Sequence, residues 1–269
     1  MERDIHWSEG LALSVATCGK GRPMVFQHGL CGDASQPADV FPNGIGWSAV
    51  TLECRGHGRS EAGFPENFSI ASFANDLISL IEARDFTPMP LAGISMGAAI
   101  ALRVAVQRPD LVSALLLARP AWLDRAAPVN MQPNFFIAGL LRDHPPAEAK
   151  EIFDRSQLAV ALAEDAPDNL ASLRGFFTRE PVETTRELLS RISMDGPGVD
   201  QEDIAALRVP VLVIGNARDA VHPLGMARKL AALIPGARFA QVTSKSDSRD
   251  LYRSGFRAAV ASFLQDFLP

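Results

Sequence analysis

The sequence predicts an α/β fold, in which a mostly parallel sheet carries helices on both faces and a helical segment is inserted into the chain. Three observations predict it. Strand-like apolar runs alternate with helix-like segments up to residue 118, this alternation stops between residues 120 and 198, and it resumes at residue 209. We therefore expect residues 1–119 and 199–269 to form one core and residues 120–198 to form a helical insertion.

The first stretch is expected to alternate between strands and helices. The segment 70–83 is predicted to be helical because apolar residues recur in it at intervals of three and four. A second helix, 95–107, ends before Pro109, since proline disfavours helical backbone in the residue that precedes it. The strands are apolar runs bounded by turn residues, and they cover residues 11–17, 23–27, 47–53, 89–93 and 111–118.

The rest of the chain first loses and then regains its strands. Between residues 120 and 198 prolines separate four expected helices, at 134–142, 147–163, 168–178 and 182–193. The alternation then returns, with strands expected at 209–215 and 237–243 and helices at 223–233 and 254–268. We find no internal repeat and no low-complexity segment in the sequence.

Composition narrows the class of protein. The chain has 269 residues, 47% of them hydrophobic and 21% charged, which is ordinary for a globular protein with a sizeable core. A net charge of −5 gives no basic surface for nucleic acid, and no apolar run is long enough to span a membrane. Cys18, Cys31 and Cys54 show no C-x-x-C spacing, and the first residues lack the apolar segment of a signal peptide. We therefore expect a cytoplasmic location with free thiols.

The stretch Gly93-Ile94-Ser95-Met96-Gly97 carries the chemistry of the sequence. It has the pattern G-x-S-x-G between an expected strand and an expected helix, which is typical of a sharp turn that exposes a nucleophilic serine. The glycines allow strand and helix to approach closely, and the helix N-terminus presents free N–H groups to a developing oxyanion. The alternative is that Ser95 only caps the helix, since serine is a favoured N-cap.

Together these residues resemble the α/β-hydrolase fold family over essentially the whole chain. Besides the serine turn, the matching pieces are His28-Gly29 after a strand, the turn 55–60, and the loop 215–223 with Asp219 at the place of the acidic catalytic residue. The serine turn is similar to that of small-molecule ester and lactone hydrolases, including enol-lactonases. A serine there argues against the dehalogenase and epoxide-hydrolase branches, whose nucleophile is an aspartate.

The resemblance implies that the helical insertion, residues 120–198, is the family's cap, and it implies roles for further residues. The backbone N–H groups of Leu30 and Met96 are expected to form an oxyanion hole, or else to bond neighbouring loop carbonyls. His28 belongs to the oxyanion loop and is counted among the residues that contact substrate. Arg119 directly follows the strand 111–118, where it is expected to bind a substrate carboxylate or to form a salt bridge to the cap.

The general base is the open question of the sequence. The family carries a histidine on the loop after its last strand, but here the loop 243–250 contains none. His222 is our first choice for the base because it shares a loop with Asp219, although so short a separation can turn its ring away from Ser95. His144 in the cap and Lys245 are the other candidates, since a lysine can act as a base when its pKa is depressed. Lys245 is also expected to contact substrate.

The leading hypothesis is a hydrolase that cleaves an ester or lactone bond of a small, carboxylate-bearing molecule through Ser95, with Asp219 and His222 as its catalytic partners. Two alternatives stay open because the usual histidine is missing: a lyase or carbon–carbon bond cleaving enzyme on the same fold, and a binding protein that has lost catalysis. We expect a small-molecule substrate, no cofactor, no metal, and no nucleic acid or membrane partner, and we leave a homodimer open.

Overall fold

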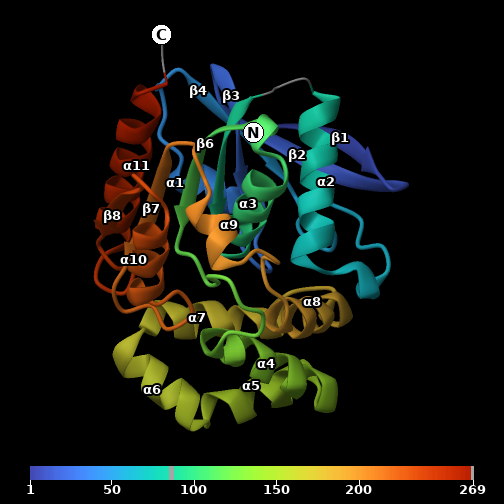
Figure 1. Cartoon of the computed structure of the whole chain (residues 1–269). Helices are drawn as coiled ribbons and strands as arrows, with labels where there is room; N and C mark the ends of the chain where they lie inside the picture. Colours follow the sequence, from blue (N-terminus) through green and yellow to red (C-terminus); the bar gives the residue numbers. More distant parts are fainter. Residues whose placement is uncertain (85–87, 268–269) are drawn as a thin grey trace.

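The computed structural model describes residues 1–84 and 88–267. The described residues form an eight-stranded sheet in the order β1-β2-β4-β3-β5-β6-β7-β8, with helices on both of its faces (Figure 1). Strands β1 and β2 pair antiparallel, as do β2 and β4, and every other neighbouring pair is parallel. The predicted fold class is thereby confirmed. The strands are β1 (Glu2–Ser8), β2 (Leu11–Gly19), β3 (Arg22–Gln27), β4 (Trp47–Leu52), β5 (Met89–Ile94), β6 (Val112–Ala118), β7 (Val211–Asn216) and β8 (Arg238–Val242).

Helices bury the sheet from two sides. Every residue of β4, β5 and β7 is buried, as expected of parallel strands that are covered on both faces. One apolar cluster joins one side of the sheet to α2 (Ile70–Ala83), α3 (Met96–Gln107) and α10 (Leu224–Leu233). A second cluster joins the other side to α1 (Ser35–Val40) and α11 (Arg249–Gln265).

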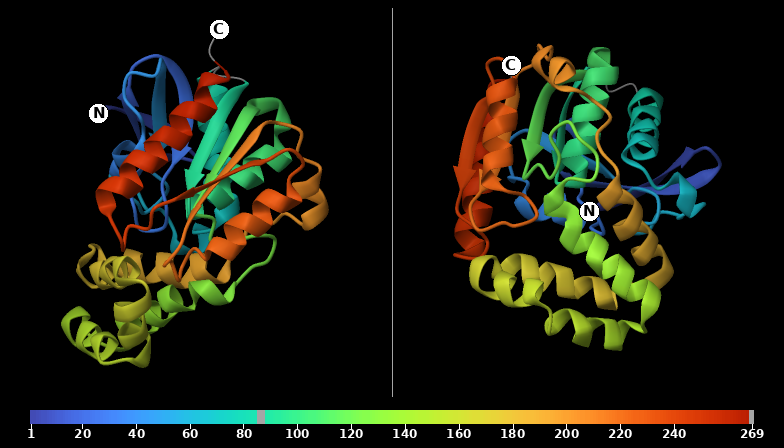
Figure 2. Two further views of the ribbon diagram at one scale, coloured as in Figure 1. Left: turned by 90° about the vertical axis from the view of Figure 1, so that its left-hand side faces the viewer. Right: turned by 60° about the horizontal axis from the view of Figure 1, so that its bottom comes forward.

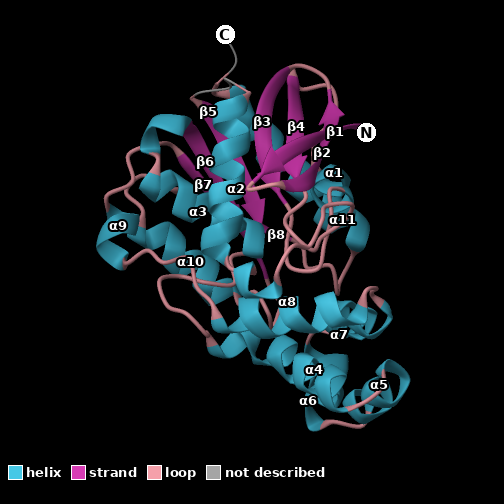
Figure 3. Ribbon diagram, turned by 90° about the vertical axis from the view of Figure 1, so that its right-hand side faces the viewer, coloured by secondary structure: helices cyan, strands magenta, loops and turns pink. Residues whose placement is uncertain are grey.

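Between β6 and β7 the chain forms a separate layer of helices, which we call the insertion (residues 120–198). Figure 2 shows this layer at one end of the sheet, and Figure 3 shows it as helices and loops without strands. It has an apolar core of its own, which includes Ile137, Phe153 and Phe177. Its helices are α4 (Gln132–Asp143), α5 (Pro146–Asp154), α6 (Gln157–Asp165), α7 (Pro167–Gly175) and α8 (Val182–Met194), and α9 (Gln201–Ala205) follows before β7.

Several elements differ from the sequence-based expectation. The helix expected over 147–163 is two helices, because the Ser156 hydroxyl caps α6 by accepting a hydrogen bond from the Ala159 N–H. The closing helix begins earlier than expected, at Arg249, where Ser248 caps it in the same way through the Leu251 N–H. Residue 268, with which that helix was expected to end, lies outside the described residues. Strand β1 and helix α1 were not predicted, because an exposed edge strand and a helix of six residues leave no strong apolar pattern.

Within the described residues no helix has both the length and the apolar character needed to cross a membrane.

Candidate active site

Ser95 lies in the turn that joins β5 to α3. Its backbone φ of 58° is in the left-handed region, which an L-residue occupies only under local constraint. The constraint is steric: a Cβ atom on Gly93 would overlap the carbonyl group of Gly97, and one on Gly97 would overlap the carbonyl group of Gln27. Although Ser95 occupies the N-cap position of α3, its side chain makes no capping hydrogen bond. Its hydroxyl is therefore available for another partner.

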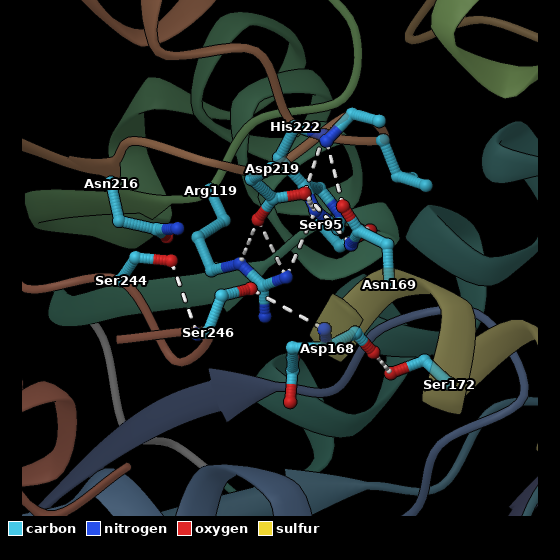
Figure 4. Close-up of polar contacts among 12 residues, drawn as sticks. Ser95, Arg119, Asp168, Asn169, Ser172, Asn216, Asp219, His222, Ser244 and Ser246 are labelled. Carbon is cyan, nitrogen blue, oxygen red and sulfur yellow. Dashed lines mark hydrogen bonds and ion pairs between the residues drawn. The ribbon is translucent and has the colours of Figure 1, made fainter. Parts of the chain in front are cut away.

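That partner is His222, on the loop between β7 and α10. The Nε2 atom of His222 lies 2.8 Å from Ser95 Oγ, and the Nδ1 atom lies 2.9 Å from Asp219 Oδ1 (Figure 4). The His222 backbone N–H donates to the same Asp219 oxygen at 3.0 Å, so the turn 219–222 closes on the carboxylate and directs the ring inward. The three residues thus form one hydrogen-bonded array, and all three side chains are buried.

Five contacts from three residues hold the Asp219 carboxylate in place. Besides its two bonds from His222, its Oδ1 accepts a hydrogen bond from Asn169 Nδ2 at 3.0 Å, and its Oδ2 accepts from Arg119 Nε at 2.9 Å and Nη2 at 2.7 Å. Burial by itself would raise the pKa of this carboxyl group. The charge of Arg119 and the contacts with His222 and Asn169 outweigh burial and hold the pKa of Asp219 well below its usual range. Asp219 is consequently a carboxylate with a fixed position.

Arg119 follows β6 with a φ of 46° and points back across the sheet edge to Asp219. Two of its guanidinium nitrogens are occupied by Asp219, and Nη2 also lies 3.1 Å from His222 Nδ1. The structure therefore places Arg119 differently from the expected carboxylate-binding role: its guanidinium is engaged with a protein carboxylate in the Ser95 array. The alternative of a salt bridge is met with a different partner, since Arg119 pairs with Asp219 of the core and not with the cap.

Burial and neighbouring charges shift the pKa of the His222 imidazole in opposite directions. Burial lowers its pKa most, the Asp219 carboxylate raises it, and the positive charge of Arg119 lowers it again, with a net depression below the usual 6.5. A neutral imidazole is thus favoured near pH 7. When the proton resides on Nδ1 it is donated to Asp219, and Nε2 is left with a lone pair that faces the Ser95 hydroxyl.

The loop after β3 includes Leu30, which lines the same cavity as Ser95. The N–H groups of Gly29, Cys31 and Gly32 are all hydrogen-bonded, whereas that of Leu30 has no partner among the described residues. The N–H of Met96, in the first turn of α3, is likewise free of a partner within residues 1–84 and 88–267. Both residues belong to the segments that meet at Ser95, as the oxyanion hypothesis requires.

His28 shapes this loop and does not reach the substrate side. Its Nε2 accepts the N–H of Cys54 at 3.0 Å, its Nδ1 lies 2.8 Å from the Gly29 carbonyl, and the residue is fully buried. Because both ring nitrogens are engaged by backbone, the expected contact of His28 with substrate is not met by its position. His57 is similar, since its Nε2 accepts the N–H of Cys31.

The remaining base candidates lie in different surroundings. His144 is at the surface of the insertion, where its ring contacts Glu148 at 2.9 Å. Lys245 follows β8 and lies beside the Ser95 cavity, with its Nζ 4.9 Å from the centre of the Tyr252 ring. Of the candidates for the base, only His222 is hydrogen-bonded to Ser95.

A cavity of about 210 Å³ opens above this array, between the carboxyl ends of the strands and the insertion. It is smaller than the usual 300–1,000 Å³ of ligand pockets, which restricts it to a small ligand or to part of one. Asn169 and Asn134 of the insertion were not predicted, because nothing local in the sequence shows that α4 and α7 fold down onto the loops of the core. The residues that line the cavity include Leu30, Ser95, Arg119, Asn134, His222 and Lys245.

The part of the chain that the structure describes contains no group of three or more histidine, cysteine or acidic side chains arranged to hold a metal ion.

Comparison with known proteins places the chain among hydrolases. The family model described as alpha/beta hydrolase fold matches residues 22–246. A Mycobacterium tuberculosis protein that bears the name non-heme bromoperoxidase BpoC is 30% identical over 238 residues, which cover 83% of this chain and 86% of that protein. A Klebsiella pneumoniae protein that bears the name carbamate hydrolase RutD is 26% identical over 196 residues, 71% of each chain. The solved enol-lactonase of Burkholderia xenovorans has the same fold, with a TM-score of 0.72 and 22% identity over 97% of this chain and 100% of that one.

Proposed function

The chain belongs to the α/β-hydrolase fold family, and on that premise we propose that it is a serine hydrolase that cleaves an ester or lactone bond of a small molecule. The observation that carries this proposal is the hydrogen-bonded array of Ser95, His222 and Asp219. Its members have the residue types and contacts of a nucleophile, a base and a carboxylate that orients the base.

The array suits acyl transfer in two stages. Ser95 Oγ attacks the carbonyl carbon of the substrate while its proton passes to His222 Nε2. The tetrahedral intermediate then collapses, the bond to the leaving alkoxy oxygen breaks, and that oxygen takes the proton from His222. In the second stage water attacks the acyl-enzyme, His222 accepts a proton from the water and returns it to Ser95, and the acid is released.

The negative charge that develops on the carbonyl oxygen needs donors that are already in place. The N–H groups of Leu30 and Met96 suit this task, since neither has a partner among the described residues and the second lies at a helix N-terminus. Arg119 and Asn169 act through Asp219, because their hydrogen bonds hold its carboxylate in position against His222.

The choice of reaction class rests on the array together with the relatives. The name carbamate hydrolase, borne by the Klebsiella relative, denotes hydrolysis at a carbonyl carbon, which is the same class of bond. The serine turn resembles that of small ester and lactone hydrolases, which favours these substrates. A base that is present and bonded to Ser95 favours hydrolysis over the alternative of a protein that only binds its ligand.

Steady-state hydrolysis of 4-nitrophenyl acetate and of small lactones tests the proposal. We expect the wild-type protein to turn over at least one of these substrates and Ser95→Ala to lose at least about 10³-fold in kcat. Hydrolysis by Ser95→Ala at the wild-type rate, or no hydrolysis by either protein, would contradict the proposal.

A further inference from the structure

Lys245 occupies an unusual position in the loop after β8. Its side chain borders the Ser95 cavity and also a second, polar cavity of about 180 Å³ between α7 and α11. The exposed Ser172 of α7 borders both cavities as well. Lys245 therefore lies between the Ser95 cavity and the second, polar cavity.

Lys245 is a cation without a counter-ion. Three carboxylates lie close enough for their negative charge to act on Lys245, and they belong to three different segments. Each of them already has an arginine partner. Lys245 itself forms no ion pair and no hydrogen bond through Nζ with any described residue, and its nearest favourable contact is the face of the Tyr252 ring. The three ion pairs are Asp39–Arg253 at 2.9 Å, Asp168–Arg249 at 3.2 Å and Asp219–Arg119 at 2.7 Å.

The surroundings of Lys245 favour the approach of an anion. Burial, followed by the charge of Arg119, lowers the pKa of Lys245 to about 8, so most of the amine remains charged at pH 7. A partly buried charge without a partner is destabilising, and a ligand that supplies the opposite charge relieves that cost.

A second polar group in the cavity also lacks a partner. Asn134 of α4 is only 4% exposed and lines the Ser95 cavity, and its Oδ1 atom is buried with no hydrogen-bond partner among the described residues. Buried amide groups are almost always hydrogen-bonded. Because this oxygen only accepts hydrogen bonds, the group that completes it is a donor such as a hydroxyl group or water, and not a carboxylate.

We propose that Lys245 anchors a carboxylate group of the substrate, so that the preferred substrate is a small ester or lactone that bears one carboxylate besides the bond that is cleaved. This inference rests on the proposed function, because it places the carboxylate in the same cavity as Ser95. One unpaired ammonium group matches a single negative charge, and the cavity of about 210 Å³ admits only a short acid.

Binding of a matched pair of small molecules tests this anchor separately from catalysis. Monomethyl succinate carries one carboxylate, and dimethyl succinate is its neutral counterpart. We would measure the dissociation constants of both by titration calorimetry in Ser95→Ala, alone and combined with Lys245→Met, Lys245→Arg or Lys229→Met. Lys229 on α10 is exposed and controls for the loss of a positive charge elsewhere. Thermal unfolding would verify that each variant is folded.

The expected result is that Ser95→Ala binds monomethyl succinate about 10- to 100-fold more tightly than the diester, the range for one charge-assisted contact. Lys245→Met should abolish this preference, whereas Lys245→Arg and Lys229→Met should retain it. The preference should also decline as the pH rises above about 8, since a neutral amine does not hold an anion.

Equal affinity for the two succinates, or a preference that survives Lys245→Met, would overturn the anchor. These outcomes are distinct from failure of the proposed function, which would appear as absent hydrolysis by the wild-type protein whatever the succinates do.

Discussion

His222 Nε2 lies 2.8 Å from Ser95 Oγ, although the two residues are 127 positions apart and belong to loops after different strands. The contact brings an imidazole to the serine from the loop after β7, which also carries Asp219. The loop after β8, where the family places its histidine, instead carries Lys245. One loop thus carries both His222 and Asp219, and under our proposal the neighbouring loop binds substrate through Lys245.

The turn around Ser95 depends on its glycines. Gly97→Ala would bring a methyl group against the backbone carbonyls of Gln27 and His28, which cannot move aside as a side chain can. We expect the free energy of unfolding to fall by about 1–3 kcal/mol, as for other overpacked sites. Gly139→Ala, in α4, is the matched control: its methyl group would meet nothing within 4 Å, and a gain of about 0.5–1 kcal/mol is expected. Urea denaturation of both variants measures the difference, and equal effects would contradict the steric account.

Asp219 should matter for activity and for stability. Asp219→Asn should lower kcat by about 10⁴-fold, because the imidazole loses the acceptor that fixes its tautomer. It should also destabilise the protein, since the buried Arg119 is left without its carboxylate. Combining Asp219→Asn with Arg119→Gln should restore part of the stability and none of the activity. A double variant less stable than the single one would show that the ion pair is not the cause.

Arg119 should set the pH range of activity. The acid limb of kcat/KM reports the pKa of the base in the free enzyme. His222 must be neutral to act, so activity is lost as the pH falls through its depressed pKa, and we expect the wild-type limb below pH 6.5. Of the charged groups around His222, Arg119 and Lys245 lower its pKa and Asp219 raises it. Removing one positive charge in Arg119→Gln should therefore shift the limb to higher pH.

The matched control for this pH profile is Arg218→Gln. Arg218 is on the same loop as His222, but it pairs with Asp247 at the surface. Its loss should therefore leave the acid limb in place. An acid limb that stays fixed in Arg119→Gln, or moves to lower pH, would contradict the role assigned to Arg119.

Site residues that belong to one local motif or loop could be predicted from the sequence, whereas contacts between distant parts of the chain could not. The serine turn is a local motif, and Asp219 and His222 are separated by only two residues in a loop, so the sequence pointed to all three. Arg119 and Asn169 reach Asp219 from 100 and 50 positions away. Their type and position were visible in the sequence, but their shared carboxylate depends on how β6 and the insertion pack, which no local pattern reveals.

The same distinction holds for the fold. Buried parallel strands form continuous apolar runs, and amphipathic helices repeat their apolar residues at regular intervals. Both patterns are strong, and α2 begins and ends at the predicted residues. Strand β1 is mostly exposed, with Trp7 67% accessible, and gains its structure by pairing with β2 rather than from a buried pattern. The break between α5 and α6 depends on a single capping hydroxyl, that of Ser156, which an otherwise continuous helical pattern conceals.

The central claim is that His222 activates Ser95, and the rate at which a fluorophosphonate probe labels Ser95 tests it most directly. The probe reacts rapidly only with a serine whose proton has an acceptor. We predict that His222→Ala slows labelling by about 10²- to 10⁴-fold, whereas His144→Ala, which alters a histidine at the surface of the insertion, labels at the wild-type rate. Labelling of His222→Ala as fast as that of the wild-type protein would contradict the account.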